Sequence, residues 1–240
     1  MRLVMGAFAC ARYAVFGFAL LTVASMSFYP GGNYRDRNSL GYHFFQNFLS
    51  DLGMPQSWSG QSNQVGALLF VTGEVLLAIG VIAFGVGVVR LSSSVYAARI
   101  LGRLAAVAGI VAAFAIVMTA FTPANQFFAA HVAAALIGFC GGAVGAALLA
   151  IAMTQDGRSP HLGVLVATLL CAVLATYAGI IKWGPAVSGD YGLRVQVTAQ
   201  KLMFVVSLSS IVYLTLVGER LSMEATRRQS ATESFGSSIR

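Results

Sequence analysis

Charged residues are scarce in this chain. Only 10% of its 240 residues are Asp, Glu, Lys or Arg, and just eight are acidic. Apolar residues make up 58% of the composition, and the mean hydropathy is +0.78. A soluble globular domain carries about 25% charged residues, so this composition excludes that class. The sequence therefore predicts an integral membrane protein.

Cysteine and the motifs of soluble cofactor enzymes are also nearly absent. The three cysteines, Cys10, Cys140 and Cys171, form no CxxC pair, and such residues pack as small apolar side chains. There is no HExxH, no GxGxxG or GxxxxGK[ST], and no GxSxG elbow. The sequence predicts no metal site and no cofactor.

Long apolar runs with few charges recur along the whole chain. About 20 such residues suffice to cross a hydrocarbon core of roughly 30 Å as a helix. Six runs qualify: residues 13–29, 65–89, 104–121, 128–153, 162–181 and 202–217. The predicted fold is all-α, a polytopic bundle of six transmembrane helices over residues 1–218. Residues 219–240, rich in Ser, Thr, Glu and Arg, are predicted to form a disordered cytoplasmic tail.

The Lys and Arg residues orient this bundle, because cytoplasmic loops carry the excess of positive charge. With the N-terminus inside, ten of the fifteen lie on the inner side, and both termini are cytoplasmic. The net charge of +7 then reflects topology and attraction to anionic lipids, and no basic stripe interleaved with aromatics points to nucleic acid. In an alternative interpretation, the first run is a cleaved secretory signal ending near VASMS, which leaves five spans.

Glycines in the fourth run form two overlapping GxxxG pairs, Gly138 with Gly142 and Gly141 with Gly145. Small residues at this spacing let helix backbones approach closely inside a membrane. Packing within the bundle and homodimerisation both account for the pattern.

Polar residues gather at the outer ends of the expected spans. Glu74 lies about nine residues into the second run, roughly 13 Å below the outer surface. Its charge at that depth calls for a proton or a counter-ion, and Lys201, Lys182 and His131 are the cations on that side. With Gln200, these residues predict an outward-facing polar pocket. A purely structural Glu74–Lys201 ion pair is the competing interpretation.

The first outer loop contains the segment YHFFQNFLSDLG at residues 42–53. Its apolar residues repeat at helical spacing, which predicts a short amphipathic helix at the interface, over residues 42–52 and ended by Gly53. Asn47, Ser50 and Asp51 share one face of this helix. Turned inward, that face is predicted to cover the pocket above Glu74 and His131. In the competing interpretation, these side chains face water or cap loop backbone. Asp51 and His43 of the first outer loop and Asn125 of the second are predicted to join the polar residues of the pocket.

These residues also carry a family resemblance. The N-x-x-S-D-x-G pattern at Asn47, Ser50, Asp51 and Gly53, followed by Phe121, Pro123, Asn125 and His131, resembles the prokaryotic membrane family catalogued as domain of unknown function 998. The pattern is distantly similar to the eukaryotic six-span Frag/DRAM/Sfk-type proteins. The resemblance covers about residues 10–218 and implies a lipid-linked role in a bacterial plasma membrane, without an assigned reaction.

Three functional hypotheses follow. In the first, the outer pocket binds or modifies membrane lipids, with Asp51, Glu74 and His131 as acid, base or headgroup contacts. Lys182 or Lys201 would then hold a phosphate or carboxylate. In the second, Glu74 and His131 exchange protons in a small proton-coupled transporter. The third is a scaffold or assembly subunit without catalysis.

Overall fold

Six long helices and one short 3-10 helix make up the protein, whose computed structural model describes residues 2–91 and 93–237, with side chains described to residue 227. The long helices are α1 (Arg2–Phe28), α2 (Gln64–Arg90), α3 (Tyr96–Phe121), α4 (Phe128–Asp156), α5 (His161–Trp183) and α6 (Asp190–Ser237). The 3-10 helix η1 (Leu49–Gly53) lies between α1 and α2. All six long helices have the length and composition to cross a membrane. The predicted six-span bundle is confirmed.

The helices are longer than the apolar runs that predicted them. α1 begins at Arg2 instead of residue 13, and α6 begins at Asp190 instead of residue 202. Hydropathy locates the part of a helix that crosses hydrocarbon, whereas the backbone continues as helix through polar residues at the interface. α6 also continues as helix to Ser237, where the sequence predicted a disordered tail from residue 219. The last three residues of that tail lie outside the described range.

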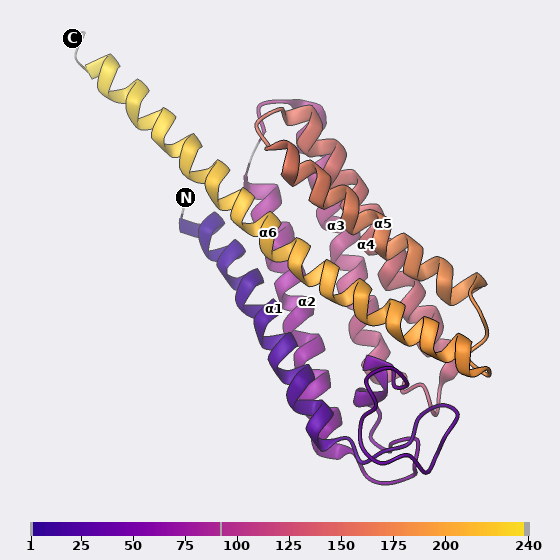
Figure 1. Cartoon of the computed structure of the whole chain (residues 1–240). Helices are drawn as coiled ribbons and strands as arrows, with labels where there is room; N and C mark the ends of the chain where they lie inside the picture. Colours follow the sequence, from indigo (N-terminus) through magenta and orange to yellow (C-terminus); the bar gives the residue numbers. More distant parts are fainter. Residues whose placement is uncertain (1, 92, 238–240) are drawn as a thin grey trace.

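The six helices form a closed ring in chain order. Each packs against the next one, and α6 returns to pack against α1. α6 crosses its neighbours obliquely and extends beyond them at the end of the bundle where the N-terminus also lies (Figure 1). α1 is therefore one wall of the ring.

Glycines at seven-residue spacing bring α2 close to α1. A Cβ added at Gly73 would lie 3.3 Å from the Phe18 ring, and one at Gly80 would lie 2.7 Å from Cβ of Ala14. One added at Gly87 would lie 2.5 Å from the Phe8 ring. A Cβ at Gly80 or Gly87 would force a neighbour to move, so these glycines allow the close approach of the two helices.

The glycine pairs of α4 pack inside the same chain. Gly138, Gly141 and Gly145 lie against backbone and small side chains of α3, and Gly142 lies against Leu174 of α5. Packing within the bundle thus takes up this face of α4. Homodimerisation through it stays a prediction.

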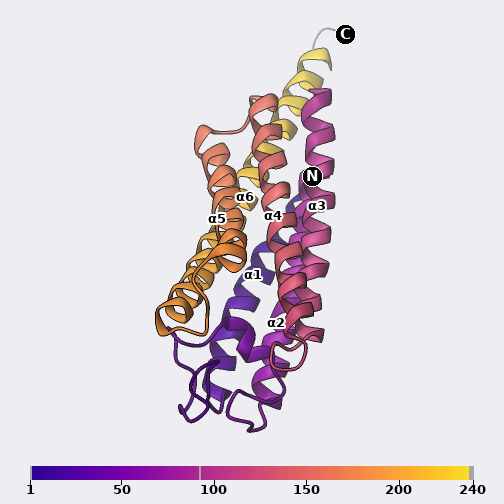
Figure 2. The same cartoon turned by 90° about the vertical axis from the view of Figure 1, so that its right-hand side faces the viewer.

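The ends of the bundle differ in their loops. The long α1–α2 connection and the short α3–α4 and α5–α6 connections lie together at the end opposite the two termini (Figure 2). Large apolar side chains such as Phe16, Leu20 and Phe114 are exposed along the outside of the helices. A lipid-facing surface of this kind fits a multi-pass membrane protein. The positive charges predict that the loop-rich end is the outer one, and this orientation stays a prediction.

Candidate functional site

The outer loop between α1 and α2 folds into a compact cap, which we define as residues 29–63. Two isolated β-bridges, Gly31 with Leu40 and Gln56 with Ser62, close its two lobes. Gly32 has a φ of +79°, and a Cβ there would lie 2.4 Å from the backbone nitrogen of Ser59. Only glycine allows this contact between the lobes. The first outer loop is therefore a folded structure that covers the ring.

Asp51 is the centre of the cap and is 1% exposed. Its Oδ1 accepts a hydrogen bond from Nε1 of Trp58 at 3.0 Å. Its Oδ2 accepts from Nδ2 of Asn47 and from the backbone N–H of Phe48, both at 3.0 Å. Burial raises the pKa of Asp51 from 3.8 to about 6, although these three hydrogen bonds and the charge of Lys201 act in the opposite direction.

Asn47 connects the segment around Asp51 to the rest of the cap. Besides Asp51, its Nδ2 donates to the carbonyl of Gly32 at 2.8 Å, and its Oδ1 accepts the backbone N–H of His43 at 3.0 Å. Every polar atom of this buried amide side chain is thus paired. Asn47 and Asp51 hold the cap together, so the N-x-x-S-D pattern has a structural role in this chain.

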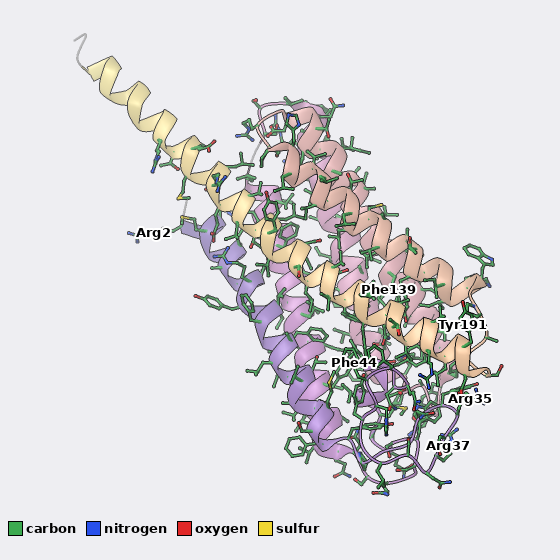
Figure 3. All side chains as sticks on the ribbon, viewed as in Figure 1. Arg2, Arg35, Arg37, Phe44, Phe139 and Tyr191 are labelled. Atoms are coloured by element: carbon green, nitrogen blue, oxygen red, sulfur yellow. The ribbon has the colours of Figure 1, made fainter. Side chains whose placement is uncertain are left out.

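The amphipathic helix expected over residues 42–52 is present only as the shorter η1, Leu49–Gly53. The Asn47 and Asp51 side chains accept the backbone N–H groups of His43 and Phe48. Such local side-chain acceptors compete with helical hydrogen bonds and favour turns. As a result, Asn47 and Asp51 are buried, whereas the sequence placed them on a helix face above the pocket. Phe44 is exposed at the outer end of the bundle (Figure 3).

α6 carries two consecutive polar residues into the cap. Nζ of Lys201 donates to the carbonyl of Asn47 at 2.6 Å and lies 4.9 Å from the centre of the Phe44 ring. The neighbouring Gln200 accepts the backbone N–H of Leu49 at 2.7 Å. Lys201 lies eleven residues into α6 and is 5% exposed, whereas the sequence placed it at the start of the span. Lys201 therefore binds the cap and does not line the cavity described below.

Glu74 lies on α2, ten residues from the helix start and about 15 Å along its axis. Its Oε1 accepts a hydrogen bond from the Thr119 hydroxyl on α3 at 3.1 Å, while Oε2 is buried with no hydrogen-bond partner. No Lys, Arg or His nitrogen among the described side chains lies within 4 Å of this carboxyl group. The competing Glu74–Lys201 ion pair is therefore not formed.

His131 occupies the first turn of α4. Its Nδ1 lies 2.9 Å from the carbonyl of Thr122. Since a carbonyl only accepts, Nδ1 carries the hydrogen, and the lone pair of the neutral imidazole is on Nε2. The ring is 9% exposed and lines the same cavity as Glu74.

A polar cavity of about 100 Å³ lies beneath the cap. Its polar lining includes five of the residues singled out in the sequence: Ser50, Asp51, Glu74, His131 and Gln200. The cap, α2, α4 and α6 thus contribute to one space, although they are far apart along the chain. The donors and acceptors of this space can hold a polar group, and the described residues lining it include no Lys or Arg.

The remaining candidates lie away from this cavity. The side chains of His43 and Lys182 are exposed at the cap surface and at the end of α5. Asn125 donates to the carbonyl of Gln56 at 2.9 Å and so connects the second outer loop to the cap. In the described part of the chain, no group of three or more His, Cys, Asp or Glu side chains could hold a metal ion.

Other residues of the cavity carry no strong signal in the sequence. Trp58 reads locally as part of a Ser- and Gly-rich loop, yet its indole binds Asp51. Thr119 and Tyr177 fall within apolar runs, where a hydroxyl is common. The only signal for Thr119 is its position one turn before Pro123, at the outer end of α3.

A second cavity, of about 150 Å³, lies deeper in the ring. Its walls come from α2, α3, α4, α5 and α6 and are apolar apart from Ser207. Three side chains, Ile116, Phe139 and Phe204, line both cavities. Phe139 of α4 packs against Phe204 of α6 and lies nearer the middle of the bundle than the cap does (Figure 3). The polar cavity and the apolar cavity are thus adjacent along the axis of the ring.

Comparisons with protein-family models, with curated proteins and with solved structures find no match. The resemblance to the family catalogued as domain of unknown function 998 therefore stays a prediction from the motif.

Proposed function

We propose that this membrane protein binds an amphiphilic lipid from the outer leaflet. The polar head occupies the polar cavity beneath the cap, and the aliphatic chain occupies the apolar cavity. The observation that carries this proposal is the shared wall of Ile116, Phe139 and Phe204. A polar space and an apolar space joined in this order match the two ends of an amphiphile. The host membrane proposed from the family resemblance is a bacterial plasma membrane.

The apolar cavity favours binding over proton-coupled transport. A proton or ion path needs water or ionisable groups along the membrane depth. Below Glu74, the cavity wall offers only the Ser207 hydroxyl, which donates to the sulfur of Met203. A cavity of about 150 Å³ lined by apolar side chains stays dry. The apolar lining of this cavity supports binding of an aliphatic chain over passage of a charge.

The proposal is tested by filling the apolar cavity. A Cβ at Gly109 on α3 would meet only Val81, at 3.6 Å, so a larger side chain there extends into the cavity. Gly109→Leu is expected to reduce the amount of co-purified lipid at least fivefold in native mass spectrometry. Ala133→Leu, on the exposed face of α4, is the matched control and should retain the lipid. Equal lipid retention in Gly109→Leu, or no bound lipid in the unmodified protein, would contradict the proposal.

A further inference from the structure

We infer that the bound lipid has a single aliphatic chain and an uncharged head with a hydroxyl group, as a monoacylglycerol or a long-chain alcohol does. This inference rests on the proposed function and specifies its ligand.

The described lining of the polar cavity lacks the cationic side chains that an anionic lipid head would need. Two carboxyl groups, Asp51 and Glu74, line this space, and no Lys or Arg does among the described residues. The nearest cation of α6, Lys201, donates to the Asn47 carbonyl and faces the Phe44 and Tyr42 rings. A phosphate or carboxylate would therefore find no counter-ion among these residues, which is unfavourable in a buried site.

The cations of the cap surface are also engaged elsewhere. Arg35 forms an ion pair with Asp190 at 2.7 Å. Arg37 stacks on the Trp58 ring at 4.2 Å and donates to the Trp58 carbonyl. Both lie at the loop end of the bundle (Figure 3). Neither lines the cavity, so an anionic head would find no guanidinium there.

The free hydrogen-bonding capacity of the cavity matches a hydroxyl group. Oε2 of Glu74 is buried without a partner, and the His131 ring, whose Nδ1 is paired with the Thr122 carbonyl, lines the same space. A buried polar atom left unpaired is costly, so a ligand that pairs with it binds preferentially. A hydroxyl both donates and accepts, and it satisfies either group in either protonation state. Asp51 offers less such capacity, since each of its oxygens already accepts at least one hydrogen bond.

The size of the apolar cavity selects one chain. The apolar cavity has a volume of about 150 Å³. An engineered protein cavity of this volume admits one benzene molecule. That space takes a segment of one aliphatic chain. A second chain would have to displace the side chains that join α3, α4 and α6 at Ile116, Phe139 and Phe204.

The test compares lipids of one chain length added to delipidated protein in detergent. The panel is monooleoylglycerol, oleyl alcohol, oleic acid, oleylamine, lysophosphatidylglycerol and dioleoylglycerol, with occupancy measured by native mass spectrometry. Monooleoylglycerol or oleyl alcohol is expected to bind at least tenfold more tightly than the charged lipids and the two-chain lipid. Tighter binding of a charged or two-chain member would overturn the inference and leave the proposed function standing. No binding by any member would overturn both.

A variant locates the head. Glu74→Gln keeps the shape of the side chain and an oxygen that accepts from Thr119, but it replaces the unpaired Oε2 with an NH₂ group. It should weaken binding of monooleoylglycerol about tenfold while leaving the thermal transition within a few degrees. Unchanged affinity would place the head elsewhere and overturn the assignment of the head to Glu74. Because the ranking of the lipids is measured on the unmodified protein, the inference remains testable even where this variant does not fold.

Discussion

Nζ of Lys201, buried eleven residues into α6, donates a hydrogen bond of 2.6 Å to the backbone carbonyl of Asn47 in the outer cap. The two residues are 154 positions apart. This contact, with that of Gln200 to the Leu49 N–H, attaches the last helix to the loop that follows the first. The cap is thus part of the folded ring and defines the roof of the polar cavity.

Replacing Lys201 tests this attachment. Lys201→Met keeps the length of the side chain but removes the donor to Asn47 and the positive charge that acts on Asp51. Losing a hydrogen bond from a charged group costs about 2 kcal/mol, so the thermal transition in detergent should fall by several degrees. Lys182→Met, at an exposed position on α5, is the control and should leave it unchanged. Equal transitions for both variants would contradict the structural role of Lys201.

Trp58→Phe tests the hydrogen bond that holds Asp51. Phenylalanine retains an aromatic ring against Arg37 and removes only the N–H donor to Oδ1 of Asp51. The free energy of unfolding should fall by about 1–2 kcal/mol, because a buried acceptor loses a partner. Trp183→Phe is the matched control, since the other tryptophan of the chain is 83% exposed. A loss of stability no greater than that of the control would show that the indole N–H is not needed.

The stability of the cap should depend on pH through Asp51. Its pKa is about 6 in the folded protein and near 3.8 when unfolded, so the folded state binds the proton more tightly. This contribution is fully present below about pH 4 and is lost as pH rises to about 6, amounting to some 3 kcal/mol. Asp51→Asn should be less stable overall but lack this slope. The temperature of the thermal transition is measured from pH 4 to 7 for the unmodified protein and for Asp51→Asn. Parallel profiles for the two proteins would contradict the assignment of this pH dependence to Asp51.

Phe8 packs between Gly87 of α2 and Gly218 of α6, at the end of the bundle where the N-terminus lies. A Cβ at Gly218 would lie 2.4 Å from the Phe8 ring. Gly218→Ala should therefore destabilise the protein by about 1–3 kcal/mol, as overpacking does. Gly6→Ala, where a Cβ would have no neighbour within 4 Å, should be neutral or slightly stabilising. The temperatures of the thermal transitions of the two variants test this prediction. An unchanged transition temperature in Gly218→Ala would mean that the helices move apart there without cost.

The bundle was predictable because the bilayer fixes the length of an apolar helix. All six spans were expected from charge-poor runs, and each matches a helix of the structure. The helix ends were not predictable to the same degree, since α6 starts twelve residues earlier than its apolar run. That extension moves Lys201 from the start of the span to its interior, where it reaches the cap instead of Glu74.

The candidate site was predictable in part. Depth alone singled out Glu74 and His131, and both line one cavity. The partners of Asp51 were beyond sequence reasoning, because Trp58 approaches it through the fold of the cap. The amphipathic pattern at residues 42–52 was misleading for a physical reason. The Asp51 side chain takes the backbone N–H of Phe48, which a helix would use, and the Asn47 side chain closes a turn on the N–H of His43.

The most direct test of lipid binding is a density map of the protein in lipid nanodiscs, at a resolution that shows side chains. If the lipid binds as proposed, the map will show one elongated density that begins beside Glu74 and His131, passes Phe139 and Phe204, and ends among the apolar walls of α3 and α4. Two cavities without such density, or a density confined to the outer surface of the ring, would contradict the proposal.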